Sequence, residues 1–236
     1  IPAYEIPPKE GPRILVAVKH VGELGDGFTI SEDGLSIAAE HFEFSLNEWD
    51  DAALEQALLL SEKIGSSEVV AVTIGPEEAE ETLRKVLAKG AHRAVRVWDD
   101  SLAAADPVTI ARALAGVAKR EEADLVLTGV QSSDLAQGAT GSATARILGL
   151  PHAAVVLEAE WDGGATLTAT REIEGGMRQR FQLPAPALLT IQTGGHTPRY
   201  ATMRMIKQAK KKTIDVLDGS AVGLDQAGAQ LRQLSM

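Results

Sequence analysis

The sequence contains no cysteine among its 236 residues. This absence excludes disulfide bonds, thiolate metal sites, iron–sulfur clusters and cysteine nucleophiles, so any redox chemistry must come from a bound cofactor. The sequence also lacks a run of about 18 apolar residues, the length that spans a bilayer, and shows no signal peptide. We therefore expect no direct insertion into a membrane.

An excess of positive charge is also missing. The chain carries 33 acidic and 23 basic residues, a formal net charge of −10, which argues against nucleic acid as the main partner. The exception is segment 193–212, TGGHTPRYATMRMIKQAKKK, which holds six basic residues and no acid. A nucleic-acid patch, a solvated helix face and a docking element for an acidic partner would each explain this basic segment.

Catalytic and metal-binding motifs are not visible. The five histidines are scattered, form no H-E-x-x-H pair and have no nucleophile or carboxylate arranged beside them, so we expect each to serve the surface or packing. The two Asp-Asp pairs, at 50–51 and 99–100, fit the first turn of a helix and a turn better than a Mg²⁺ site. We expect no catalytic side chains and no metal site.

The first 150 residues repeat one pattern, in which a short apolar run is followed by an amphipathic helix. Such apolar runs are typical of parallel strands that are buried on both faces. The βαβαβαβα order predicts a Rossmann-like open parallel sheet with helices on both faces. The expected strands lie at 13–19, 68–75, 94–98 and 124–129, and the expected helices at 48–64, 76–89, 107–122 and 137–148.

The first expected helix has clear signals at both ends. Asn47 is a plausible N-cap, acids fill the first turn, and Gly65 follows the last turn. Trp49 begins a series of apolar residues at helical spacing that continues to Ile64, so periodicity predicts that it lies in the core. Its place just after a loop makes a cofactor contact the alternative.

The pattern changes after Pro151. Four apolar runs, at 153–161, 165–173, 177–183 and 186–192, are separated by Gly-Gly pairs and other turn signals that predict added antiparallel strands. We divide the chain into a disordered extension or artificial remnant at 1–12, an α/β nucleotide-binding domain at 13–192, the basic segment at 193–212, and an extended C-terminal arm at 213–236.

Ligands of open parallel sheets bind outside the carboxyl ends of the strands. Here the strands end at Val18–Lys19, Ile74–Gly75 and Thr128–Gly129, and the last runs into a segment rich in glycine and hydroxyl groups at 129–149. Such a loop, entering a helix, can present backbone N–H groups to phosphate. It matches neither G-x-G-x-x-G nor the Walker A pattern, so a plain connection remains the alternative.

Several motifs together resemble the β subunit of electron transfer flavoproteins. They are ILVAVKHV, SLNEWDDAALEQAL, LAKGAHRAVRVWDD, LVLTGVQSSD, REIEGG, LPAPALLTIQ and PRYATMRMIKQAKKK, in an order that covers about Arg13 to Asp218. The resemblance implies an electron carrier that is half of an αβ heterodimer, with FAD mainly in the α subunit. It implies a structural AMP in this subunit, and partner dehydrogenases whose electrons pass to electron transfer flavoprotein–quinone oxidoreductase. A bacterial cytoplasm or a mitochondrial matrix would be its location.

The resemblance also assigns cofactor-binding residues, which coincide with the strand ends identified above. Trp49 matches an aromatic residue that flanks the flavin. The run SSDLAQGAT is less acidic and polar than in many members, which leaves a second FAD, as in bifurcating members, as the alternative to AMP. The assigned residues are Ala17, Asn47, Glu48, Trp49, Asp50, Ile74, Gly129, Gln131, Ser132, Ser133, Asp134, Gln137, Gly138, Ala139 and Thr140.

The basic segment corresponds to the loop with which the family recognises dehydrogenases, and Met203 matches its apolar anchor. The alternative is that Met203, Met205 and Ile206 pack their helix on the core. The arm at 213–236, with Leu224, Leu231 and Leu234, is expected to pack on the α subunit. The resemblance assigns partner contacts to Pro198, Arg199, Tyr200, Met203, Arg204, Lys207, Lys210 and Lys211.

Two functions of other classes compete with the electron carrier. One is a stand-alone regulator that binds an adenine nucleotide without flavin. The other is an ATP-splitting enzyme with a related sheet, which would need an S-G-G-x-D type loop after the first strand. The sequence there, VKHVGELGDG, does not supply that loop.

Overall fold

The structure of the chain, a computed structural model, describes residues 5–32, 34, 37–103 and 105–224. The strands are β1 (Arg13–Ala17), β2 (His20–Leu24), β3 (Phe42–Leu46), β4 (Glu68–Ile74), β5 (Arg93–Val97), β6 (Leu125–Gly129), β7 (His152–Glu160), β8 (Thr166–Ile173), β9 (Met177–Pro184), β10 (Ala187–Ile191) and β11 (Asp215–Leu217). The helices are α1 (Glu48–Ile64), α2 (Glu80–Lys89), α3 (Pro107–Arg120), α4 (Thr140–Leu148) and α5 (Met203–Ala209). Short 3₁₀ turns lie at Ala39–His41, Glu77–Ala79, Asp100–Leu102, Glu174–Gly176 and Ser220–Val222.

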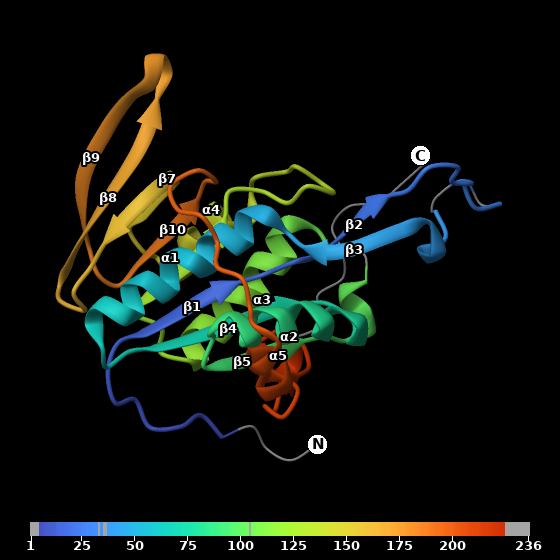
Figure 1. Ribbon diagram of the computed structural model, residues 1–236, viewed down its shortest axis with the longest axis horizontal. Coiled ribbons are helices and arrows are strands. Elements are labelled where there is room, and N and C mark those ends of the chain that lie inside the picture. The colour runs from blue at the N-terminus through green and yellow to red at the C-terminus, as the bar shows by residue number, and fades with distance from the viewer. Residues whose placement is uncertain (1–4, 33, 35–36, 104, 225–236) are drawn as a thin grey trace.

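One mixed sheet organises the domain. In the described residues it has nine strands, in the order β11-β5-β4-β1-β6-β10-β7-β8-β9. Alternate residues of each central strand face opposite layers, so that Ile14 and Val16 pack under α1 and α2 while Leu15 packs under α3 and α4. Figure 1 shows these helices on the two faces of the sheet. The predicted α/β fold with helices on both faces is confirmed.

The last central strand corrects one sequence prediction. Residues 186–192 were expected to join an antiparallel group, but β10 pairs in parallel with both β6 and β7. In this sheet, as far as the structure describes it, the antiparallel pairs are β7 with β8 and β8 with β9, and β8 and β9 form a long hairpin that projects from the body (Figure 1). The turn signals identified the hairpin correctly, but they could not reveal that the next strand returns to the middle of the sheet.

A second projection was not predicted. The strand expected at 13–19 ends at Ala17, and β2 then pairs antiparallel with β3 to form a two-stranded ribbon (Figure 1). The ring of His20 stacks on Phe44 with centroids 4.8 Å apart, and its Nδ1 lies 2.9 Å from the Thr82 hydroxyl. The ribbon places the start of α1 beside the end of β1.

The two ends of the described chain are tied to the domain. Residues 5–12 contain no helix or strand, but Lys9 pairs with Asp124 at 2.7 Å and the buried Arg13 donates to the carbonyl of Pro7. Part of the expected C-terminal arm forms β11, which pairs with β5, and Leu224 is buried against this chain's own core. Leu231 and Leu234 lie outside the described residues. Within 5–224, apart from the gaps given above, no helix is long and apolar enough to cross a membrane.

Candidate functional site

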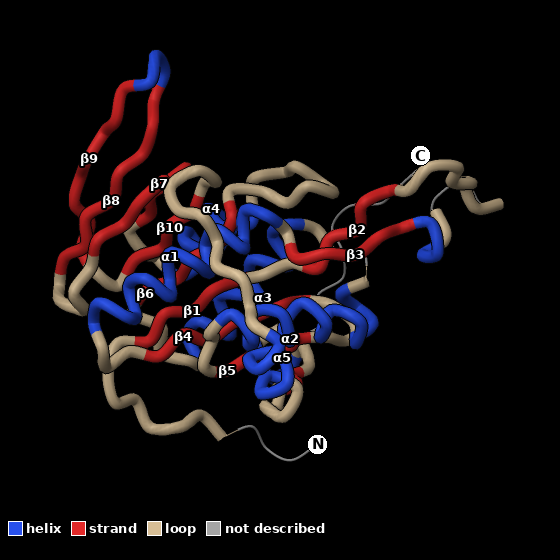
Figure 2. The backbone as a smooth tube through the Cα atoms, viewed as in Figure 1, coloured by secondary structure: helices blue, strands red, loops and turns tan. Residues whose placement is uncertain are grey.

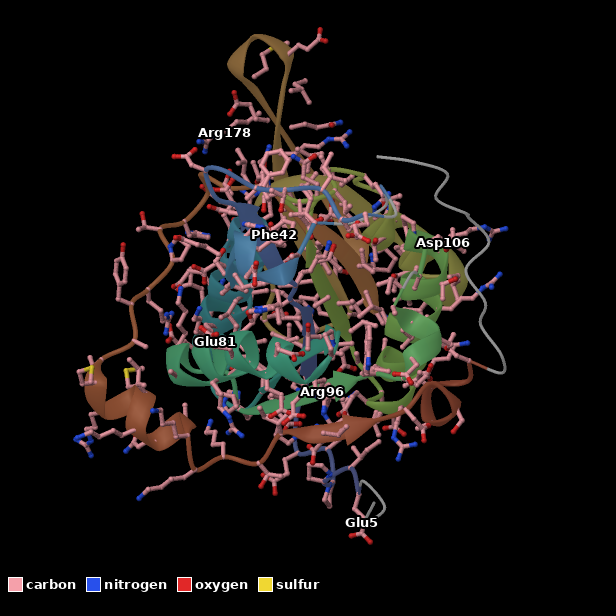
Figure 3. All side chains as sticks on the ribbon, turned by 90° about the vertical axis from the view of Figure 1, so that its right-hand side faces the viewer. Glu5, Phe42, Glu81, Arg96, Asp106 and Arg178 are labelled. Atoms are coloured by element: carbon pink, nitrogen blue, oxygen red, sulfur yellow. The ribbon has the colours of Figure 1, made fainter. Side chains whose placement is uncertain are left out.

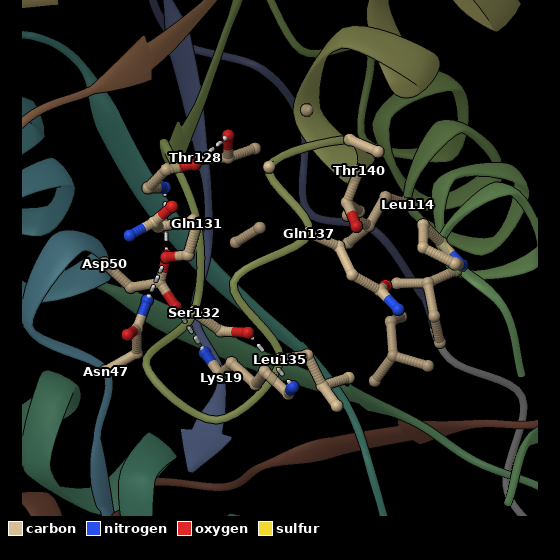
Figure 4. A pocket seen from close by; sticks show the side chains of 18 of the residues that line it. Lys19, Asn47, Asp50, Leu114, Thr128, Gln131, Ser132, Leu135, Gln137 and Thr140 are labelled. Atoms are coloured by element: carbon tan, nitrogen blue, oxygen red, sulfur yellow. Dashed lines mark hydrogen bonds between the residues drawn. The ribbon is translucent and has the colours of Figure 1, made fainter. Parts of the chain in front are cut away.

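A cavity opens at the carboxyl ends of β1, β4 and β6, where an open parallel sheet is expected to bind ligands (Figure 4). Its volume is about 150 Å³, and about 820 Å³ with the space at its mouth. One water molecule needs only about 10–15 Å³ in the same measure, so the cavity is large enough to take part of an organic ligand. Its walls come from the strand ends, the start of α1, the loop 130–139, the first turn of α4 and one side of α3.

The side chain of Asp50 holds the floor of this cavity together. One carboxylate oxygen accepts the backbone N–H of Lys19 at 2.8 Å, just beyond β1. The other accepts the N–H of Gly129 at 2.9 Å, at the end of β6. A Cβ atom on Gly129 would lie 2.5 Å from the Asp50 carboxylate, so only glycine allows this close approach.

The carboxylate of Asp50 is buried, with the whole residue 7% exposed. Burial raises the pKa of Asp50 from its ordinary value to about 7, and the hydrogen bonds from Asn47, Gly129 and Lys19 oppose that rise. A carboxyl group that gains or loses a proton near neutral pH therefore lies where α1 and two strands meet.

Asn47 precedes α1 as predicted, but its side chain does not cap the helix. Instead its amide nitrogen donates to the carbonyl of Gln131 at 2.8 Å, and its amide oxygen accepts the N–H of Ser133 at 3.2 Å. Asn47 thus ties the start of α1 to the loop after β6. Asn47 and Asp50, which sequence analysis placed at the start of a helix, therefore shape the cavity floor.

The opposite wall suits a flat apolar group with an anionic end. Pro107, Ile110 and Leu114 of α3 give an apolar surface. The first turn of α4 has no acidic residue and no side-chain cap, and Thr140 and Gly141 of this turn, whose N–H groups have no acceptor within the helix, line the cavity. Gly141 lets α4 approach β6, because a Cβ there would lie 2.5 Å from the Thr128 hydroxyl.

Most of the sequence-predicted cofactor residues line this one cavity. Those that line it are Ala17, Asn47, Asp50, Ile74, Gly129, Gln131, Ser132, Gln137, Gly138, Ala139 and Thr140. The cavity walls do not include Glu48, Trp49, Ser133 or Asp134. Sequence reasoning missed Lys19, whose amine reaches Asp134 at 2.7 Å across the mouth, and the α3 wall, which no motif marked.

Trp49 is half-buried, does not line the cavity and lies beside the start of the basic segment 193–212. Its indole N–H donates to the side-chain oxygen of Gln192 at 2.7 Å, and the same oxygen accepts the N–H of Thr193. Trp49 therefore holds the start of the basic segment, at the end of β10. Its predicted place beside a flavin stays a prediction.

The loop between β10 and α5 crosses the face of α1 (Figure 2) and is clamped there by Arg199. The guanidinium group binds Glu55 at 2.9 Å and Glu62 at 2.5 Å, and the backbone N–H of Arg199 also donates to the Glu55 carboxylate. Burial of Glu55 opposes ionisation, but the hydrogen bonds from Arg199 outweigh it and hold the pKa of Glu55 below its usual range. Arg199, expected to contact a partner, is thus engaged within the chain.

The loop that Arg199 holds on α1, together with the start of α5, exposes apolar side chains to solvent. Tyr200 is 90% exposed and Met203 is 70% exposed, the largest exposed fractions among the large hydrophobic residues described. Met203 therefore does not pack on the core, and the residues of α5 that pack there are Ile206 and Ala209. The side chains of Arg204, Lys207, Lys210 and Lys211 are exposed around Met203. Among the described residues, no three His, Asp or Glu side chains are grouped as potential metal ligands.

Comparison with known proteins identifies related sequences. Residues 35–222 match the family described as the electron transfer flavoprotein domain. The chain is 46% identical over 214 residues to the electron transfer flavoprotein subunit beta of Methylophilus methylotrophus, covering 90% of this chain and 81% of that protein. It is 36% identical over 215 residues to the human protein of the same name, covering 90% and 84% of the two chains. The mitochondrial protein of that name from Arabidopsis thaliana is 34% identical over 203 residues, covering 86% and 80%.

Replacing Asp50 with Asn should remove a pH-dependent part of the stability. The folded-state pKa of Asp50, about 7, lies above the unfolded value of about 3.9. At a pH between these two values, the folded chain keeps a proton that the unfolded chain has released. This contribution is fully present below about pH 4 and is lost as the pH rises to about 7. The free energy of unfolding of the wild type, relative to Asp50→Asn, should therefore fall by about 4 kcal/mol over this range in urea titrations.

The control for this comparison is Asp51→Asn, which removes the neighbouring carboxylate that pairs with Lys89 at 2.6 Å. This variant tests whether the loss of any negative charge at the start of α1 changes the pH dependence of the free energy of unfolding in the same way. If the difference in the free energy of unfolding between the wild type and Asp50→Asn stayed constant with pH, Asp50 would titrate in its ordinary range.

Replacing Arg199 with Met should loosen the loop and destabilise the fold. The change leaves the buried Glu55 carboxylate without its guanidinium partner, and because the Arg199 side chain is 28% exposed we expect a loss of about 1–3 kcal/mol. Arg204→Met, on the exposed side of α5, should change the free energy of unfolding by less than about 0.5 kcal/mol. Equal effects of the two substitutions in thermal melts would contradict the clamp.

Proposed function

The chain belongs to the electron transfer flavoprotein family, among its β subunits, and from this premise we propose that it forms a heterodimer with an α subunit, binds AMP in its own cavity and docks dehydrogenases. It is an electron carrier subunit. The heterodimer would take electrons from these dehydrogenases through FAD, held mainly by the α subunit, and pass them to a quinone oxidoreductase. A bacterial cytoplasm or a mitochondrial matrix is the proposed location.

One observation carries the proposal of a bound nucleotide: the cavity joins an apolar wall to a helix N-terminus that is free of acidic residues. The α3 side suits a purine ring, and the N–H groups of the first turn of α4 suit a phosphate. Thr140, at the start of α4, adds a hydroxyl group that can donate to a phosphate oxygen. The lining fits AMP, which would be structural because it carries no electrons.

FAD, when bound, supplies the redox chemistry of the heterodimer. The chain contains no cysteine that could take part in redox chemistry. Its residues would therefore contribute by bordering the FAD and excluding water from it. From the resemblance we infer that Trp49 would lie beside the flavin, with its indole N–H held by Gln192. The exposed side chains on the β2–β3 ribbon, Leu24 and Phe44, offer contact area for the α subunit.

The basic segment would dock the dehydrogenase by two separate forces. Exposed lysines on and after α5 attract an acidic surface and raise the association rate, an effect that weakens as salt shortens the Debye length from about 10 Å at 0.1 M to about 3 Å at 1 M. Met203 would enter an apolar pocket of the partner. Burying such a side chain contributes about 1.5–3 kcal/mol, roughly ten- to over a hundredfold in affinity.

Two alternatives predict different cofactor contents. A bifurcating subunit would hold a second FAD in the cavity, and a stand-alone regulator would hold an adenine nucleotide without any flavin partner. Co-expression with the α subunit, followed by acid extraction and chromatography, distinguishes the three. We expect a yellow heterodimer with one FAD and one AMP. Two FAD and no AMP would favour bifurcation, and a colourless monomer with bound nucleotide would favour the regulator.

Replacing Met203 with Ala should slow electron transfer from a dehydrogenase by about tenfold or more at limiting partner concentration, because the apolar contact is lost. The melting temperature should change little, because Met203 is 70% exposed in this chain. A matched control is Met177→Ala, at the start of β9, where the methionine is 62% exposed but lies far along the hairpin. A large drop in melting temperature with a normal rate of transfer would end the docking role of Met203.

A further inference from the structure

The sulfur chemistry of this chain is confined to methionine. It has no cysteine and four methionines, so a mild oxidant that attacks sulfur can modify only these four side chains. Met203 and Met177 are 70% and 62% exposed, and Met205 is partly buried. Figure 3 shows the sulfur atoms of α5 (yellow) at the margin of the molecule. Met236 lies outside the described residues.

The surroundings of Met203 can accommodate the oxidised form of its side chain in the free protein. Met203, Arg204, Lys207, Gln208 and Lys211 together line a shallow hollow on α5. The other four side chains all carry N–H donors, and none of the five is acidic. A sulfoxide oxygen is a strong acceptor, so these donors and water can satisfy it at this position. The start of the helix does not depend on Met203, because the Thr202 hydroxyl accepts the N–H of Met205 at 3.3 Å.

We propose that Met203 is a reversible oxidation site whose sulfoxide form switches dehydrogenase docking off; this inference rests on the docking role proposed above. Hydrogen peroxide transfers one oxygen atom to the thioether sulfur, which loses two electrons, and the peroxide is reduced to water. A methionine sulfoxide reductase reverses the change with two thiols as the electron source, releasing water and leaving a disulfide on the reductase. Nothing else in the chain needs to change.

The switch works because the thioether form of Met203 favours an apolar environment and the sulfoxide form favours a polar one. The thioether is apolar and gains from entering an apolar pocket. The sulfoxide would lose its hydrogen bonds to water and to the basic side chains if it entered the same pocket, and a buried polar group without a partner is unfavourable. We expect the affinity for the dehydrogenase to fall at least tenfold on oxidation, while FAD and AMP contents stay unchanged.

The test uses the co-expressed heterodimer and two purified dehydrogenases, one acting on acyl-CoA thioesters and one on methylated amines. Whichever reduces the wild-type heterodimer serves as the probe. The heterodimer is treated with dilute hydrogen peroxide, the sulfoxide at each methionine is quantified by peptide mass spectrometry, and the dissociation constant for the dehydrogenase is measured. We expect Met203 to be oxidised ahead of Met205, the affinity to fall in proportion, and a methionine sulfoxide reductase to restore it.

Three variants make the result specific. Met203→Leu keeps an apolar side chain of similar size but cannot be oxidised, so it should dock normally and resist peroxide. Met177→Leu removes the other highly exposed methionine of the described chain and should leave peroxide sensitivity as in the wild type. Met203→Gln places a polar group of similar length at the site and should dock as weakly as the oxidised protein.

The outcomes separate this inference from the function on which it rests. If Met203→Ala weakens docking but complete oxidation of Met203 does not, the switch is wrong and the docking role stands. If Met203→Leu loses affinity on peroxide treatment as the wild type does, oxidation acts elsewhere and the switch is wrong. If neither Met203→Ala nor oxidation changes the dissociation constant, both the docking role of this residue and the switch are wrong.

Discussion

One buried carboxylate determines the shape of the cavity at the carboxyl ends of the strands. The side chain of Asp50 holds the ends of β1 and β6 at a fixed separation through the N–H groups of Lys19 and Gly129. Removing a carboxylate from water is unfavourable, and these hydrogen bonds are what make its burial tolerable. The floor of the cavity, the entry to α1 and the direction of the loop after β6 all follow from this arrangement. Asn47 extends it by holding the loop itself.

Helix α1 joins the two regions on which the proposed function depends. Its first turn forms the cavity floor, and its later turns carry Glu55 and Glu62, which hold Arg199 and so the docking loop. Trp49 holds the other end of that loop through Gln192. The loop is therefore fixed at Gln192 and at Arg199 while Tyr200 and Met203 remain exposed, so little conformational entropy would be lost if a partner bound there.

The sequence predicted the local features of this fold well and the long-range ones less well. Apolar runs and helix caps identified the βα units, because those signals depend on nearby residues; Asp106, for example, caps α3 as its position before Pro107 indicates. The parallel pairing of β10 and the ribbon β2–β3 depend on contacts between distant segments, which no local pattern encodes. Most of the residues predicted to bind a cofactor line one cavity, because strand ends can be located from the sequence. The direction of the Asp50 and Trp49 side chains was not accessible, because it depends on partners about 80 and 140 residues away.

The central place of β10 has a consequence for the synthesis of the chain. On one side β6 pairs with β1, but on its other side it pairs only with residues 187–191, which are made after β7, β8 and β9. While the ribosome extends the chain through β7–β9, β6 presents an unpaired row of N–H and C=O groups, and a strand edge of this kind invites wrong pairing with other chains. The βα units can form early, but the hairpin has no place on the sheet until β10 arrives. A nascent chain halted in the hairpin is thus a natural client for chaperones that cover exposed strand edges.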